Sequence, residues 1–374
     1  MKVCMDIQSA IAQRAGVGRY TRSLVEALSL SITPEDVLRI FFFDFQRKGR
    51  PFPLAKVEER AARWIPGRWV QQAWKTIDSP PFNWFAGAAD VYHFPNFIRP
   101  PLTRGRSVVT IHDVSFLRHP EAAETKNLRY LTAKIRDTVD RADRILTDCS
   151  FVAKEITELL GAAPARVAPV YPGLPKGFSG ATAESISGVR SRQGLTRPYV
   201  LMVGTLEPRK NHAFLVEVFE RMPFFDGDLV LAGMRGWKVE PILERIRDSS
   251  RADRIHLLDY VEDADLQALY TGAELFLFPS LYEGFGFPPL EAMACGCPVL
   301  ASTAGALVEV LGEGAELLET QDAEQWAEAA RRILSEGTAA RAARIARGRN
   351  RTQLYTWEAA AHKIWGIYRE VAAS

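Results

Sequence analysis

Short apolar runs alternate with amphipathic stretches along the whole chain. The runs, bounded by Gly, Pro or polar residues, predict strands, and the stretches with apolar residues at helical spacing predict helices. Their alternation is typical of parallel strands joined by crossover helices. The pattern therefore predicts an α/β protein.

The predicted strands fall into two sets, each sufficient for a complete sheet. Those of the first half are residues 2–7, 37–45, 89–94, 107–113, 144–149 and 165–173. Those of the second half are residues 198–204, 228–233, 254–260, 275–280, 297–303 and 315–319, with helices such as 211–222 and 241–249 between them. We expect two Rossmann-like domains with parallel sheets that face each other across a cleft.

The domain boundary is placed where Gly, Pro and Ser accumulate and the periodicity fades. This gives a first domain at residues 1–172, a linker at 173–190 and a second domain at 191–355. The last helix, residues 356–374, could pack on either domain, including back on the first.

Length and composition agree with this organisation. The 374 residues suit two domains of ordinary size, and 47% hydrophobic with 25% charged residues excludes a disordered or fibrous chain. The net charge of +2 favours no nucleic-acid partner. The four cysteines lack zinc-ligand spacing, and the N-terminal residues lack the features of a signal peptide, so we expect a cytoplasmic protein with reduced thiols.

Candidate chemistry is sought at the carboxyl ends of the strands, where open α/β sheets bind ligands. Gly16 and Gly18 follow the first strand and could let backbone amides approach a phosphate, or could simply form a tight turn. The dinucleotide fingerprint is incomplete, since Thr21 stands at the third glycine position. His112 ends the strand at 107–113 and is either a structural histidine or a residue of a ligand site.

The second domain offers two charged loops. Arg209 and Lys210 follow the strand at 198–204 and suit a diphosphate, although a solvated basic turn has the same pattern. Glu283 and Glu291 follow the strand at 275–280, and the prolines at 288 and 289 predict that a helix begins there. Glu291 could accept hydrogen bonds from ribose hydroxyls or could face solvent on a capped helix.

At these residues the sequence resembles the family-4 retaining glycosyltransferases of the GT-B fold. The resemblance rests on Glu283 and Glu291 within EGFGFPPLEAMACGCPVLAS, and on GTLEPRKN, GVGRYT, IHDV and TDCSFVAKEI. It implies a nucleotide diphosphate sugar as donor, no metal and no other cofactor. Similarity to bacterial mannosyltransferases of surface polysaccharide synthesis implies GDP-mannose first and UDP-sugars next, with a glycan or polyprenyl-linked glycan as acceptor.

The resemblance also implies roles for individual residues. Arg209 and Lys210 would neutralise the donor diphosphate, Glu291 would hold the ribose, and His112 would lie at the sugar near the reacting carbon. The donor sugar would be held by Glu283 and by the amides near Phe285, Gly286 and Phe287. Gly16 and Gly18 would lie under the phosphates or the acceptor, and Val261 is a looser candidate for a base contact.

Two further patterns bear on partners. Residues 47–75 mix tryptophans with basic residues, which suits a lipid headgroup surface, although the aromatics could instead cover the sheet of the first domain. The residues concerned are Trp64, Trp69, Trp74, Arg47, Lys48, Arg50, Lys56, Arg60, Arg63, Arg68 and Lys75. The Asp226–Asp228 and Asp263–Asp265 pairs match a metal-binding Asp-x-Asp motif but are interpreted as a turn and a helix cap.

Three other functions compete with a transferase. A nicotinamide-dependent oxidoreductase would use the glycines at 16 and 18, and a glycoside hydrolase would use Glu283 and Glu291 as its carboxylate pair. A non-catalytic sugar-nucleotide-binding protein would share every feature of the donor site.

Overall fold

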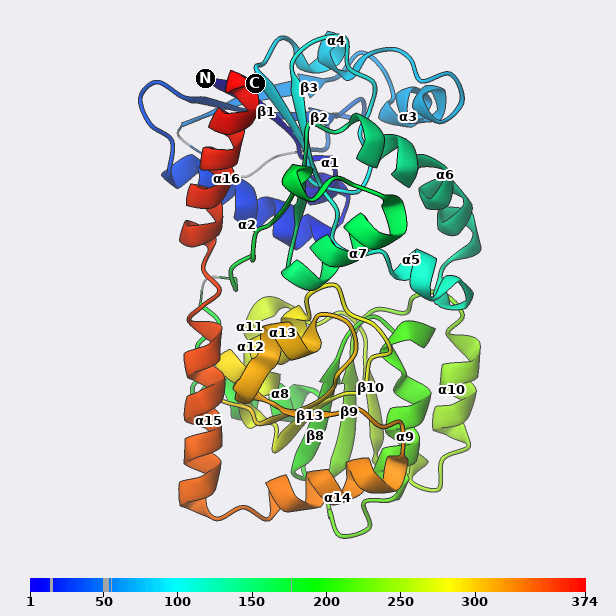
Figure 1. Ribbon diagram of the computed structural model, residues 1–374. Coiled ribbons are helices and arrows are strands. Elements are labelled where there is room, and N and C mark those ends of the chain that lie inside the picture. The colour runs from blue at the N-terminus through cyan, green and yellow to red at the C-terminus, as the bar shows by residue number, and fades with distance from the viewer. Residues whose placement is uncertain (14–15, 50–53, 55, 176) are drawn as a thin grey trace. The chain divides into compact units, whose positions relative to one another are not determined.

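The chain folds into two compact units. The computed structural model describes residues 1–13, 16–49, 54, 56–175 and 177–374. The first unit comprises Met1–Leu117, Thr125–Gly173 and Tyr355–Ser374, and the second comprises Arg118–Glu124 and Leu174–Leu354 (Figure 1). Each unit is described below by itself.

The first unit is built on a parallel sheet with the strand order β3-β2-β1-β4-β5-β6-β7. Every neighbouring pair in that order runs parallel. The strands are β1 Lys2–Asp6, β2 Val37–Phe43, β3 Val57–Ala62, β4 Val91–Phe94, β5 Arg106–Thr110, β6 Arg144–Thr147 and β7 Val167–Pro169. The central strands β1, β4 and β5 are mostly buried, as expected where helices cover both faces of a parallel sheet.

Strand β3 is absent from the sequence prediction. Three of its six residues, VEERAA, are charged, and only Ala62 is buried. It pairs with β2 on one side only, as the edge strand of the sheet. An edge strand needs no apolar run, so hydrophobic patterning could not find it.

The helices of the first unit include α2, which has one apolar face, and the C-terminal helix α16, which packs against it (Figure 1). The indole Nε1 of Trp365 on α16 donates to the carbonyl of Leu28 at 3.2 Å. The helices are α1 Gln8–Ala12, α2 Val17–Leu30, α3 Gly67–Thr76, α4 Phe82–Ala86, α5 Ser115–Arg118, whose last residue belongs to the second unit, α6 Thr125–Arg141, α7 Ser150–Leu160 and α16 Trp357–Ala373, with a 3₁₀ turn η2 at Pro164–Arg166.

The second unit has its own parallel sheet, with the order β10-β9-β8-β11-β12-β13. Its strands are β8 Tyr199–Val203, β9 Asp228–Ala232, β10 Ile255–Leu258, β11 Leu275–Phe278, β12 Val299–Ser302 and β13 Glu316–Leu318. Each strand run that the sequence predicts overlaps one of the observed strands, and the predicted α/β class with two parallel sheets is confirmed.

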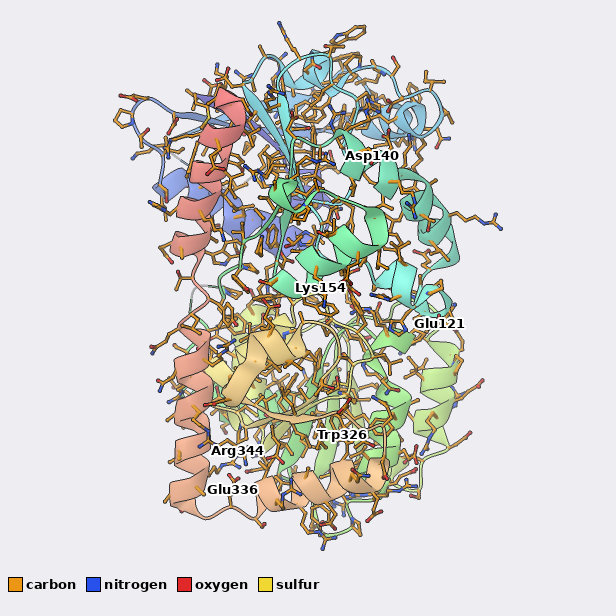
Figure 2. The ribbon with its side chains drawn as sticks, viewed as in Figure 1. Glu121, Asp140, Lys154, Trp326, Glu336 and Arg344 are labelled. Carbon is orange, nitrogen blue, oxygen red and sulfur yellow. The ribbon has the colours of Figure 1, made fainter. Side chains whose placement is uncertain are left out.

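Helices α14 and α15 are held in the second unit by a buried tryptophan and by ion pairs of their arginines. Trp326 of α14 is fully buried, and Arg344 of α15 donates to Glu336 at 3.0 Å (Figure 2). The helices of this unit are α8 Ala183–Arg192, α9 His212–Glu220, α10 Glu240–Arg247, α11 Asp263–Gly272, α12 Phe287–Ala294, α13 Leu307–Leu311, α14 Ala323–Leu334 and α15 Thr338–Thr352. The 3₁₀ turns are η1 Pro120–Ala122, η3 Pro208–Lys210, η4 Ala252–Arg254 and η5 Gly312–Gly314.

The boundaries of the two observed units differ from the predicted domain boundaries in two places. Most of helix α8 lies within the predicted linker at 173–190, where it packs on α11 of the second unit. The short segment Arg118–Glu124 belongs to the second unit although its neighbours in the sequence belong to the first. Contacts distant in sequence decide both assignments, so local composition does not show them.

Helix α16 is fixed to the first sheet through a buried hydrogen bond. His93 Nδ1 lies 2.6 Å from the hydroxyl of Tyr368, and His93 Nε2 lies 2.8 Å from the hydroxyl of Thr110. Burial lowers the pKa of His93 to about 3, so its ring stays neutral.

We predict that Tyr368→Phe destabilises the protein by about 1–3 kcal/mol, because it leaves a buried imidazole nitrogen without its partner while preserving the ring. Urea unfolding followed by tryptophan fluorescence measures this loss. Glu370→Gln on the same helix is the control: it removes only an ion pair to Arg144 in which Glu370 is 64% exposed. Equal stability of Tyr368→Phe and the wild type would contradict the prediction.

Candidate donor site and the family of the chain

The strand order of the second sheet reverses between β8 and β11. Strands β9 and β10 extend the sheet on one side of β8, and β12 and β13 extend it on the other side of β11. Loops at such a reversal diverge and leave room for a ligand at the carboxyl ends of the strands. Here the two loops touch, since Leu281 N donates to the carbonyl of Arg209 at 2.8 Å.

These two loops bring together four charged residues, here called the charge cluster: Glu207, Arg209, Lys210 and Glu283. Lys210 Nζ donates to Glu283 Oε1 at 2.6 Å, and Arg209 Nη1 lies 3.3 Å from Glu283 Oε2. The other guanidinium nitrogen, Nη2, donates to Glu207 Oε1 at 2.6 Å. Two cations are thus held by two carboxylates.

The charge cluster is buried, which excludes the solvated basic turn. The side chains of Lys210 and Glu283 are 10% and 7% exposed. Burial alone would raise the pKa of Glu283, but the charges of Lys210 and Arg209 outweigh it and lower that pKa below its ordinary value. Glu283 is therefore ionised at neutral pH and is unsuited to be the protonated acid of a glycoside hydrolase.

The backbone at Glu283 is fixed by the loop after β12. Ala306 N donates to the carbonyl of Glu283 at 2.9 Å. The neighbouring Gly305 has φ +63°, and a Cβ there would lie 2.3 Å from the same carbonyl oxygen. Only glycine fits this approach, so a residue that sequence reasoning did not single out helps to place Glu283.

Glu291 lies in α12 and is also buried, at 2% exposure. The hydroxyl of Tyr270 on α11 donates to Glu291 Oε2 at 3.0 Å. The helix begins close to the predicted position, with Gly286 as its N-cap and prolines in its first turn. Phe287 is the first residue of the helix and does not belong to the preceding loop. The alternative of a solvent-facing Glu291 is wrong. The two glutamates of the motif thus have different partners.

The aromatic residues between the two glutamates also pack inward. Phe285 is 4% exposed, and its ring centroid lies 4.9 Å from that of Phe287. Val261 is half-buried in the segment between β10 and α11.

A segment from the first half of the chain borders this site. Trp237 Nε1 donates to the carbonyl of Ala122 at 2.6 Å, and Lys238 Nζ donates to the carbonyl of Glu121, whose side chain Figure 2 labels. The ring of His119 lies 6.0 Å from that of Tyr282, the residue before Glu283. Residues 118–124 thereby belong to the second unit and lie beside the loop that contains Glu283.

In the first unit, Gly16 and Gly18 lie at the start of α2. Gly16 is its N-cap with φ +56°. A Cβ on Gly18 would lie 2.1 Å from the carbonyl oxygen of Gln13. This close contact with the backbone of Gln13 requires glycine at position 18. A tight turn, without a bound phosphate, is therefore sufficient to explain this glycine.

His112 follows β5 and binds through both ring nitrogens. Nδ1 lies 2.7 Å from Asp148 Oδ2, and Nε2 lies 2.9 Å from the carbonyl of Pro95. Burial opposes a charge on the ring, but the charge and hydrogen bond of Asp148 raise the pKa of His112 above its ordinary value.

The aspartate pairs have partners of their own. Asp226 pairs with Arg254 and is exposed, Asp228 starts β9 beside His256, and Asp265 in α11 pairs with Arg192. Asp228 is the first residue of β9, and Asp263 and Asp265 lie in the first turn of α11. The predicted helix cap is wrong, because the N-cap of α11 is Glu262.

Sequence reasoning missed four side chains at these edges. Glu207, Tyr270 and Asp148 partner the predicted residues, and Asp6 ends β1, where burial raises its pKa to about 6. Glu207 lies in GTLEPRKN and Asp148 lies in TDCSFVAKEI, two of the motifs on which the family resemblance rests. Their place in these motifs is the sequence signal that could have identified them.

We predict that Glu283→Gln destabilises the protein by about 3 kcal/mol near neutral pH, because two buried cations lose a carboxylate. Since folding lowers the pKa of Glu283, its contribution is complete above the ordinary value of 4.5 and is lost as the pH falls through the folded-state pKa. Urea unfolding of both proteins as a function of pH measures the difference.

The control is Glu328→Gln, which breaks an exposed ion pair to Arg331 and should cost at most about 1 kcal/mol. A difference between Glu283→Gln and the wild type that stays constant down to strongly acidic pH would contradict the prediction.

Comparisons with known proteins identify the family of the chain. Residues 189–351 match the family described as glycosyl transferases group 1. The chain is 30% identical over 345 residues to the O-antigen chain mannosyltransferase B of Escherichia coli, covering 86% of this chain and 87% of the relative.

Solved structures with the GT-B fold resemble the whole chain. The sucrose-phosphate synthase of Thermosynechococcus elongatus has a TM-score of 0.78 at 22% identity, with both chains fully covered. The HepE protein of Anabaena, solved with UDP and glucose, has a TM-score of 0.72 at 17% identity, over 99% of this chain and 100% of that one.

These matches support neither the nicotinamide-dependent oxidoreductase nor the non-catalytic binding protein. The relative is matched over most of both chains, and the family model is matched within the second unit. The chain therefore belongs to the glycosyl transferases group 1 family and has the GT-B fold.

Proposed function

We propose that this glycosyltransferase is a retaining hexosyltransferase that moves mannose from GDP-mannose to a glycan or polyprenyl-linked glycan in the cytoplasm. The observation that carries the proposal is the charge cluster, which holds two cations at the carboxyl ends of β8 and β11. A nucleotide diphosphate presents negative charge of the kind that such a pair recognises.

The cations are positioned before the donor arrives. An ammonium has three N–H donors, so Lys210 can keep its bond to Glu283 and still donate to a phosphate oxygen. Preorganised charges of this kind stabilise a leaving group without reorganisation during the reaction. Because Arg209 and Lys210 supply this charge, we propose that the departing diphosphate needs no metal ion.

The remaining donor contacts are assigned by position. Glu291 would hold the ribose through its carboxylate, which Tyr270 orients. The amides of Phe285, Gly286 and Phe287 would hold the donor sugar at the start of α12, and Val261 would border the base. In the first unit, Gly16 and Gly18 would lie near the phosphates or the acceptor and His112 near the reacting carbon.

Mannose as the transferred sugar is supported by the name of the Escherichia coli relative, an O-antigen chain mannosyltransferase. The Anabaena structure with UDP and glucose supports a nucleotide and a sugar as ligands of this fold and keeps UDP-sugars as the second candidates.

We predict that GDP-mannose raises the melting temperature of the full chain, because a ligand bound only by the folded state stabilises it by mass action. Thermal-shift measurements with GDP-, UDP-, ADP- and TDP-sugars test this, and a positive donor is then used to assay transfer. Glu291→Ala should abolish the shift. Glu313→Ala, at an exposed glutamate of the same unit, should leave it unchanged.

A shift with UDP-sugars alone would reassign the donor. The absence of a shift with every nucleotide sugar would contradict the proposed donor site.

We also propose that residues 47–75 contact a membrane surface. Trp64 and Trp69 are 70% and 61% exposed, and the nearby Trp84 is 67% exposed. Trp74 instead packs inward, donating from Nε1 to the carbonyl of Pro80 at 2.6 Å, as expected of an aromatic that covers the sheet.

Charge around these tryptophans supports anionic lipid. Arg68 and Lys75 are exposed on α3, and Arg47, Lys48 and Lys56 are exposed before it, while Arg50 lies outside the described residues. Among the described residues, the structure contains no helix with the length and apolar character that a bilayer crossing requires.

We predict that the wild type floats with vesicles containing phosphatidylglycerol and that Trp64→Ala/Trp69→Ala reduces the bound fraction several-fold, because each indole contributes interfacial area. The matched control is Leu30→Ala, at an apolar residue of the first unit that is 67% exposed. Failure of the wild type to float, or unchanged binding of the double variant, would contradict membrane contact.

A further inference from the structure

Both ring nitrogens of His112 lie within hydrogen-bonding distance of oxygen atoms that accept hydrogen bonds. Its partners are a carboxylate oxygen of Asp148 at 2.7 Å and the carbonyl oxygen of Pro95 at 2.9 Å. A carbonyl cannot donate, and an ionised carboxylate cannot donate. With Asp148 as a carboxylate, both bonds therefore exist together only when Nδ1 and Nε2 each carry a proton.

Three separate chain segments enforce this arrangement at one edge of the first sheet. Pro95 follows β4, His112 follows β5 and Asp148 follows β6. Within the Pro95 segment, Phe97 adopts φ +57°, a conformation unusual for a non-glycine residue, and its amide donates to the carbonyl of Thr110 at 2.9 Å. Such a conformation persists only where the surroundings determine it.

The ring is also confined by its neighbours. The centroid of Tyr20 on α2 lies 4.6 Å away, and that of Phe97 lies 5.9 Å away. The His112 and Asp148 side chains are 11% and 5% exposed. Little space remains for the ring to turn toward another partner.

We propose that Asp148 is a positioning residue of the transferase, which together with the Pro95 carbonyl holds His112 as a fixed imidazolium. In this state the ring can neither take a proton from an acceptor hydroxyl nor release one to a leaving phosphate without breaking a buried bond. His112 then serves the reaction through its main chain and its fixed position. This inference rests on the proposed function for its consequence in catalysis, whereas the protonation state rests on the two hydrogen bonds of the ring with Asp148 as a carboxylate.

The charged and titratable groups around His112 favour the protonated form of its ring. Asp148 approaches from the segment after β6, Asp113 lies on its own loop, Tyr20 lies on α2 and His93 lies on β4. His93 stays neutral because burial lowers its pKa to about 3, and it adds no competing positive charge at neutral pH. The two aspartates both raise the pKa of His112.

The test is a pH titration of the full chain labelled with ¹⁵N-histidine, with the His112 signals assigned through His112→Gln. In the wild type, both ring nitrogens should remain protonated to a pH clearly above the ordinary midpoint of 6.5. In Asp148→Asn the midpoint should fall by roughly one to three pH units. Asp143→Asn is the control, because Asp143 binds Ser107 and Arg106 at the opposite end of β6 and should leave the midpoint unchanged.

A wild-type His112 that is neutral at pH 7, or an unchanged midpoint in Asp148→Asn, overturns the proposal. If Asp148→Asn does not fold, the titration of the wild type alone tests whether His112 is protonated on both nitrogens at neutral pH. Once a donor is known, Asp148→Asn should lower turnover at least tenfold with little change in the KM for donor. Failure of every donor in the transfer assay would instead count against the proposed function, because the titration does not depend on it.

Discussion

A charge that leaves water must meet an opposite charge or hydrogen-bonding groups, and both candidate sites of this protein depend on that constraint. In the second unit, Lys210 and Arg209 are buried together with Glu283 and Glu207. In the first unit, His112 is buried with Asp148. Without these pairs, each cation would lose its charge or its position.

The pairs can form because the strands of each sheet run parallel. Parallel strands bring all their carboxyl ends to one edge, so loops far apart in sequence become neighbours there. Lys210 and Glu283 are separated by 73 residues, yet their side chains lie 2.6 Å apart. The same geometry places Asp148 against His112 in the first unit. Close backbone approach completes the second site, where only glycine fits at position 305.

Glu283 and Glu291, the two glutamates of the sequence motif, have different partners. Glu283 is tied to the cations, and its lowered pKa keeps it charged. Glu291 is buried in α12 and receives the hydroxyl of Tyr270. The proposed donor site therefore contains one carboxylate that is paired with positive charge and one that is assigned to the proposed ribose contact. This division explains why a transferase with a charged leaving group fits the site better than a hydrolase with an acid and a nucleophile.

The sequence by itself determined the α/β class, the two sheets and most strands, because buried parallel strands must be apolar and apolar runs are visible locally. It also placed Arg209, Lys210, Glu283 and Glu291 in loops or helix starts at strand ends. Only the tertiary structure decided what pairs with what: Glu207 with Arg209, Tyr270 with Glu291 and Asp148 with His112. It alone also showed the polar edge strand β3 and assigned residues 118–124 to the second unit. These features depend on contacts between distant segments, which leave no periodic signal in the chain.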